Sequence, residues 1–159
     1  MREKPTNELD ELLKDMKPEQ LDEYYKENGE YMVNARKEFS YYMKNVMAEK
    51  NLTYANRKMC LKDIYSIAGV SESYGEKILN MNKHTKNRDL ILRFCIAGHF
   101  LPDEINRALK LYGMRPLYAK DKRDACIIVA INNRKYDLFE IDAMLEKQGL
   151  DKLSKEIEK

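Results

Sequence analysis

Apolar residues recur every three or four positions along most of the chain, the spacing of a helix that buries one face. The clearest stripe lies within residues 36–50 and consists of Phe39, Tyr42, Met43, Val46 and Met47. The pattern predicts helices over residues 7–16, 18–28, 36–50, 61–68, 72–79, 88–97, 102–112, 121–132 and 138–148. Few hairpin signals interrupt it, so the predicted fold class is all-α.

Glycines and capping residues set the predicted helix ends. Gly69 stops one helix, and Ser71, two residues later, can cap the next because its hydroxyl accepts from an unpaired backbone N–H. Gly98 ends a further helix, Pro102 suits the first turn of the one after it, and Asp121 can cap the helix beyond. The stretch 51–60 is ambiguous between a loop and the start of the following helix.

The helices group into four parts along the sequence. Residues 1–35 form an N-terminal helical arm, and residues 36–113 hold five helices that we expect to surround one core without a strand. Residues 114–150 add two helices packed on that core. Residues 151–159 are charged, which predicts a frayed tail.

Composition narrows the functional class. The three cysteines are not closely spaced, which favours buried thiols in a reducing cytoplasm over disulfides or a metal site. No nucleophile elbow, phosphate-binding glycine loop, HExxH or CxxC motif is present, so we expect neither an enzyme nor a cofactor. No apolar stretch is long enough for a membrane span, and the start lacks the apolar core of a signal peptide. We therefore expect a cytoplasmic protein.

The net charge of +2 conceals an uneven distribution. Residues 41–136 carry 18 lysines and arginines against 9 aspartates and glutamates, whereas residues 1–40 and 137–159 are each net acidic. A polyanion would meet the basic middle of the chain. The alternative is an ordinary solvated helical surface on which basic residues cluster by chance.

Several short motifs follow one another in a specific order. The turn Gly69-Val70-Ser71 precedes the runs SYGEKIL, KNRDLILRFCIAG, PDEINRALKLYGMRPLY and KRDACIIVAINN. Over residues 38–150 this order resembles the Cro/repressor-type (XRE-like) helix-turn-helix family, and within it a Firmicute subgroup with two extra C-terminal helices. Several features differ from the family pattern. Leu61 stands where glutamine is common, and the stretch between Leu52 and Leu61 is longer than usual. Tyr65 stands where a small residue is usual, and Gly75 lies inside the second helix of the pair.

The resemblance implies a lambda-repressor-like five-helix bundle that binds double-stranded DNA as a transcriptional regulator, commonly as a homodimer. The helix at about 71–80 would enter the major groove, and the loop after it would hold phosphates. The residues expected at this interface are Ser71, Ser73, Tyr74, Lys77, Asn82, Lys83, His84, Lys86, Asn87 and Arg88.

A second interpretation keeps the fold without DNA binding. Glu72 and Glu76 lie on the outward side of the predicted groove-reading helix, where phosphates would repel them. The chain would then be a protein–protein interaction module. A second basic cluster, which holds Lys120, Lys122 and Arg123, lies outside the five-helix part and is expected to be a surface feature.

Overall fold

The computed structural model describes residues 6–28 and 35–154. The chain divides into two compact units, Met1–Asn34 and Ala35–Lys159. The described residues are mostly helical, as the all-α prediction requires, with one small two-stranded sheet.

The described part of the first unit, residues 6–28, contains two short helical segments. Helix α1 spans Thr6–Lys14, and the 3₁₀ helix η1 (Pro18–Gln20) leads directly into α2 (Leu21–Glu27). Pro18 occupies the first turn, as predicted, because its missing N–H has no intrahelical partner there. The remainder of the predicted arm, residues 1–5 and 29–34, lies outside the described residues.

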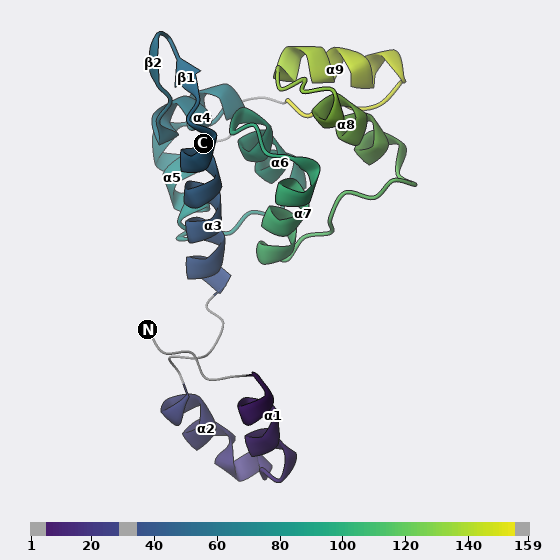
Figure 1. The fold of residues 1–159 in the computed structure, drawn as a ribbon. Coiled ribbons are helices and arrows are strands. Elements are labelled where there is room, and N and C mark those ends of the chain that lie inside the picture. Colours follow the sequence, from purple (N-terminus) through teal and green to yellow (C-terminus); the bar gives the residue numbers. More distant parts are fainter. Residues whose placement is uncertain (1–5, 29–34, 155–159) are drawn as a thin grey trace. The chain divides into compact units, whose positions relative to one another are not determined.

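The second unit contains seven helices within its described part, and Figure 1 shows them ordered from α3 to α9. Their bounds are α3 Ala35–Lys50, α4 Leu61–Ala68, α5 Glu72–Leu79, α6 Arg88–Ala97, α7 Pro102–Leu111, α8 Lys122–Asn132 and α9 Leu138–Lys147. Each bound agrees closely with the prediction, because local signals determine it. Ser71 and Asp121 accept from the backbone N–H groups of Tyr74 and Asp124, as N-caps do.

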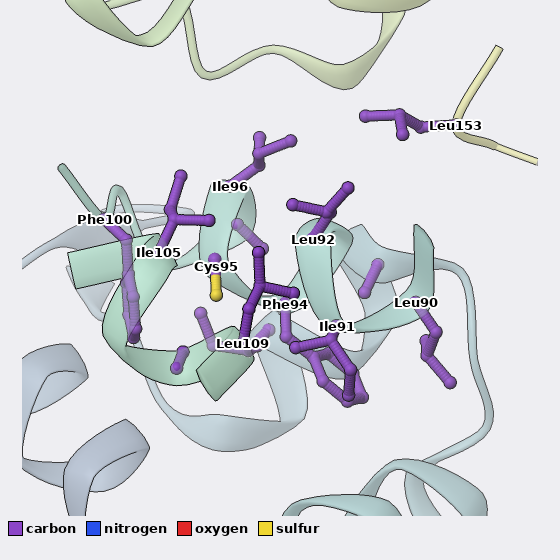
Figure 2. Close-up of a cluster of buried hydrophobic side chains, with 14 of the residues drawn as sticks. Leu90, Ile91, Leu92, Phe94, Cys95, Ile96, Phe100, Ile105, Leu109 and Leu153 are labelled. Atoms are coloured by element: carbon purple, nitrogen blue, oxygen red, sulfur yellow. The ribbon is translucent and has the colours of Figure 1, made fainter. Parts of the chain in front are cut away.

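Helix α6 is the centre of this unit. Every residue from Leu90 to Ala97 is buried, which is typical of a helix covered on all sides. Helices α4, α7 and α9 all pack against it. In Figure 2, Leu92 and Ile96 project from α6 toward the side where Leu153 lies, whereas Ile91 and Phe94 project to the other side.

Residues 51–60 form neither a plain loop nor the start of α4. Strands β1 (Thr53–Tyr54) and β2 (Arg57–Lys58) pair antiparallel in a small hairpin. Ala55 and Asn56 both have positive φ, of 53° and 63°, as a two-residue type I′ turn requires. The prediction of a five-helix part without a strand is therefore wrong.

Two Arg-Asp dipeptides join helix α8 to helix α6. Each dipeptide lies at the start of a helix, Arg88-Asp89 in α6 and Arg123-Asp124 in α8. Arg88 donates two hydrogen bonds to Asp124, both at 2.9 Å. Arg123 donates two to Asp89, at 2.6 and 2.9 Å. The two helix starts thus exchange partners in two bidentate ion pairs, which fixes their relative geometry.

The segment after α9 is held by the core. Leu153 is fully buried, and its backbone N–H donates to Asp142 at 2.8 Å. Its carbonyl accepts from Arg93, a buried α6 side chain that also donates to the Ala68 carbonyl. The prediction of a frayed tail is therefore wrong for residues 151–154. Residues 155–159 lie outside the described residues.

Candidate nucleic-acid interface

Helices α4 and α5 form a pair joined by the three-residue turn Gly69-Val70-Ser71. Gly69 has a φ of +80°, a left-handed conformation that glycine adopts without a Cβ penalty. Val70 is buried beneath the turn, and Ser71 then caps α5. The pair therefore has a defined geometry set by a glycine, an apolar anchor and a cap.

The Tyr65 ring of α4 packs directly against Gly75 of α5. A Cβ built on Gly75 would lie 2.5 Å from Cδ1 of Tyr65, which no real packing allows. Tyr65 and Gly75 therefore compensate for each other, since a large ring on α4 requires a residue without a side chain on α5. Burial, together with nearby Glu76 and Glu72, raises the pKa of Tyr65 to about 12.

The outer face of α5 is polar and open to solvent. Ser71, Ser73 and Lys77 of the predicted interface are exposed on it. Tyr74 is only partly exposed, because its ring packs at the edge of the core. The same helix buries Ile78 on its inner side, so α5 is amphipathic as expected of a groove-facing helix.

The loop after α5 presents several predicted residues beside this face. Asn82, Lys83, His84 and Lys86 are all exposed. The Lys83 ammonium lies 5.2 Å from the centre of the Tyr74 ring, in a cation–π contact that ties the loop to α5. The contact leaves the ammonium at the surface.

The His84 ring is oriented by the core beneath the loop. It stacks on Tyr112, with ring centroids 4.6 Å apart. The Tyr112 hydroxyl accepts from the backbone N–H of the buried Thr85 at 3.0 Å. These contacts fix the middle of the loop, so its exposed side chains are displayed from a defined backbone.

Asn87 and Arg88 have structural roles instead of lying free at the end of the loop. Asn87 caps α6 and accepts from the backbone N–H of Leu90. Arg88 donates to Asp124 and to two backbone carbonyls of the connector between α7 and α8. Four of the five N–H donors of its guanidinium are therefore engaged within the fold. We correct the predicted interface by removing both residues from it.

Arg123 likewise belongs to the fold, although it was expected to be a surface feature. Besides Asp89, it donates to the carbonyls of Asp151 and Lys152. The hydrogen bonds that it donates to Asp89 raise the pKa of its guanidinium. The positive charge of the middle of the chain is thus partly neutralised inside the molecule.

The first turn of α4 contributes groups that the sequence did not single out. Lys62 is exposed and lies 4.0 Å from Glu72 of α5. Arg57 of the hairpin forms a bidentate ion pair with Asp63, at 2.7 and 2.8 Å, and this pair holds the pKa of Asp63 well below its usual range. The sequence did offer one indication of this role for Lys62. It is the second residue of α4, the helix paired with α5.

Cys60 departs from the expectation of buried thiols. It is exposed at the N-cap of α4, where its backbone N–H donates to Asp63. Cys95 is buried, and burial raises the pKa of its thiol, while Cys126 is partly buried. Only Cys95 sits fully in the core, because only α6 is covered on every side.

Negative charge interrupts the candidate interface. Glu72 and Glu76 are both exposed on the same helix as Lys77. Lys62 lies near Glu72 at a distance that gives little binding energy between exposed groups. The surface of α5 and its loop therefore mixes both signs of charge, with lysines more numerous toward the loop.

Within residues 6–28 and 35–154, no three His, Cys, Asp or Glu side chains are grouped so that they could hold a metal ion. None of the described helices is both long and apolar enough to cross a membrane.

No family model matches the chain, and comparisons with curated proteins and with solved structures find no significant similarity.

Proposed function

We propose that the protein is a DNA-binding transcriptional regulator whose helix pair α4–α5 acts as a helix-turn-helix. In this proposal residues 36–113 correspond to a lambda-repressor-like bundle, and α5 lies in the major groove. The proposal rests on one observation above all. Helix α5 displays an open polar face, and exposed lysines of the following loop lie beside it.

Each interface residue has a specific role in the proposal. Ser71 and Ser73, at the N-terminal end of α5, would contact base edges or phosphates through their hydroxyls. Lys77 would bind a guanine or a phosphate, and Lys83 and Lys86 would bind phosphates from the loop. Lys77 and Lys86 form no ion pair with any residue in the described part, so their charge is available to a polyanion.

The two carboxylates on α5 make the proposed interface selective. A carboxylate in the major groove is favourable only where it accepts from a cytosine amino group. Glu72 and Glu76 would therefore weaken binding to most sequences. A homodimer would place two such helices at half-sites about one helical turn apart, roughly 34–36 Å.

Salt-dependent DNA binding tests the proposal directly. We would measure fluorescence anisotropy of labelled mixed genomic fragments at low and moderate salt, with the full chain. The test variant is Lys77→Ala/Lys83→Ala/Lys86→Ala. The control, Lys120→Ala/Lys135→Ala/Lys147→Ala, removes the same charge from exposed lysines outside the α5 face and its loop.

The wild type and the control should bind with a steep salt dependence. The test variant should lose affinity, and its salt slope should fall by about 3, because each phosphate contact contributes about 0.9 to the slope. Absence of binding at low salt would contradict the proposal. An equal loss of DNA affinity in both variants would show that the protein binds DNA only through non-specific charge attraction.

The second candidate function is a protein-interaction module, and the exposed carboxylates favour it. Glu72 and Glu76 would then meet a basic partner through α5. The variant Glu72→Gln/Glu76→Gln distinguishes the two functions. It should bind DNA more tightly and less selectively if α5 reads a groove, and it should leave DNA binding unchanged if α5 serves another partner.

A further inference from the structure

A cavity lies beside α4, the first helix of the pair. Its volume is about 340 Å³, within the range of small-molecule sites. It is bounded by the C-terminal half of α3, the residues flanking the hairpin and the first turns of α4. Its lining residues are Lys44, Met47, Ala48, Asn51, Leu52, Lys58, Met59, Cys60, Leu61, Ile64 and Gly98.

Most of this lining is apolar and adaptable. Leu61 and Ile64 of α4 form one wall, and Met47 of α3 and Met59 after the hairpin form others. Methionine side chains change rotamer at little cost, so such a wall can fit an aliphatic chain. Leu52 closes the side below the hairpin, where its carbonyl accepts from the Met59 N–H at 2.8 Å.

Gly98 lines the cavity next to Met47. Its φ is −86°, which any residue can adopt, so glycine is not required for the backbone. A Cβ at this position would lie 3.3 Å from Cγ of Met47 and 2.9 Å from the Phe100 ring. Glycine is therefore required for space, at the position where Met47 lines the cavity.

The charged groups at the cavity are both cations. Lys58 is exposed and forms no ion pair with any residue that the structure describes, and Lys44 donates to the neutral Asn80 side chain at 2.7 Å. No carboxylate belongs to the lining. Nearby Arg57 is held by Asp63, so it does not compete with Lys58 for an anion. An apolar cavity with a cationic rim is complementary to a molecule that has an apolar chain and one anionic head.

We propose that this cavity binds a small amphiphilic carboxylate, such as a medium-chain fatty acid, with Lys58 as the partner of the carboxylate. The chain of the ligand packs between α3 and α4, and its head lies beside the hairpin. The ligand then contacts the first helix of the pair that carries the proposed DNA-binding face. Its binding is measurable without DNA, so it stands or falls independently of the proposed function.

Octanoate is the probe, and isothermal titration calorimetry of the full chain is the measurement. Octanol, which has the chain without the charge, and acetate, which has the charge without the chain, are the ligand controls. Two variants test the site. Ala48→Leu places a larger side chain into the cavity from an exposed α3 position, and Lys58→Gln removes the cation. Lys62→Gln, on exposed α4 surface outside the lining, is the matched control.

Octanoate should bind saturably, and both octanol and acetate should bind more weakly. Ala48→Leu should abolish binding, and Lys58→Gln should weaken it roughly three- to tenfold, as expected for loss of one exposed charge-assisted hydrogen bond. Lys62→Gln should bind like the wild type. Circular dichroism confirms that each variant folds. Equal binding of octanol and octanoate, or binding that survives Ala48→Leu, would overturn the proposal, as would no binding of octanoate.

The exposed thiol of Cys60, which lines the cavity, gives a second readout. In a Cys126→Ser background, Cys60 is the accessible cysteine, because Cys95 is buried. Saturating octanoate should slow its reaction with a disulfide reagent, and octanol at the same concentration should slow it less. An unchanged reaction rate in octanoate would place the ligand elsewhere and contradict the proposal.

Discussion

The α4–α5 pair and the junction of α6 with α8 are held together by different forces. In the pair, the ring of Tyr65 fills the space that Gly75 leaves, so shape decides the geometry. At the junction, Arg88 and Arg123 bind carboxylates of the opposite helix, so charge decides it. The two regions also use the cations of the basic middle of the chain, residues 41–136, in different ways. Arg88 and Arg123 are used inside the fold, whereas the lysines beside α5 remain exposed.

This division follows from the chemistry of the two side chains. The planar guanidinium forms two parallel hydrogen bonds with a carboxylate, which fixes a helix start in both position and direction. The lysine ammonium is a mobile point charge, suited to a phosphate whose position varies. Sequence charge alone does not separate these uses, because it counts Arg88 and Lys86 equally.

The largest expected effect is at the junction. Arg88→Met should lower the free energy of unfolding by about 3 kcal/mol, because Asp124 is only 2% exposed and would lose its bidentate partner. Urea denaturation followed by circular dichroism measures the change. Replacing both partners, in Arg88→Met/Asp124→Leu, should recover much of the loss.

Arg115 provides the matched control for this prediction. Its guanidinium lies 3.6 Å from the same carboxylate but is 57% exposed. Arg115→Met should therefore cost less than about 1 kcal/mol. If Arg88→Met were no more destabilising than Arg115→Met, charge would not be what holds α8 to the core.

The next effect tests shape in the helix pair. Gly75→Ala should destabilise the protein by about 1–3 kcal/mol, because the new methyl group would overlap the Tyr65 ring. In a Tyr65→Ala background the same change should be neutral or stabilising, since alanine favours a helix by about 1 kcal/mol over glycine. A double-mutant cycle by urea denaturation measures the coupling. Additive effects would show that the two residues do not compensate.

Local signals explain why the helix bounds could be predicted. Gly69, Ser71, Pro102 and Asp121 act within one turn of their own position, so the sequence around each is sufficient. The hairpin was missed because its turn is Ala55-Asn56, which lacks the glycine that normally marks a type I′ turn.

Long-range partners explain what could not be predicted of the candidate interface. Arg88 precedes its partner Asp124 by 36 residues, and nothing near Arg88 indicates that its charge is already used. The tail was misjudged for the same reason, since Leu153 is one apolar residue among charged ones and its pocket is formed elsewhere. The repeated Arg-Asp dipeptide at two helix starts was the available signal for the junction.

A smaller effect separates stability from binding at the start of α5. Ser71→Ala should cost about 1 kcal/mol, because it removes the hydroxyl that accepts from the Tyr74 N–H. Ser71→Asp should retain stability, since aspartate is a good N-cap, but it should weaken DNA binding by repelling phosphates. Thermal unfolding and anisotropy measure the two properties. Tighter DNA binding by Ser71→Asp would remove Ser71 from the proposed interface.

The smallest effect is a dependence of stability on pH at the end of α6. His99 stacks on Tyr136, with centroids 4.3 Å apart, and burial together with nearby Lys50 lowers its pKa. Since the folded pKa lies below the unfolded value of about 6.5, the unfolded chain binds the proton first. Neutral His99 therefore makes its full contribution to stability above the unfolded pKa. This contribution is lost as the pH falls from the unfolded pKa through the folded pKa.

The test compares the wild type with His99→Asn in urea denaturation between about pH 7.5 and about pH 5.5, on either side of the usual histidine value of about 6.5. Asparagine tolerates the positive φ of 58° at this position, so the backbone should be retained. The wild type should lose more stability than the variant as the pH falls. Lys50→Gln should reduce this difference without abolishing it, because burial is the larger cause. An identical pH dependence in the wild type and His99→Asn would show that the stacked ring is not held neutral by its surroundings, and that this corner, like the helix pair, is determined by shape alone.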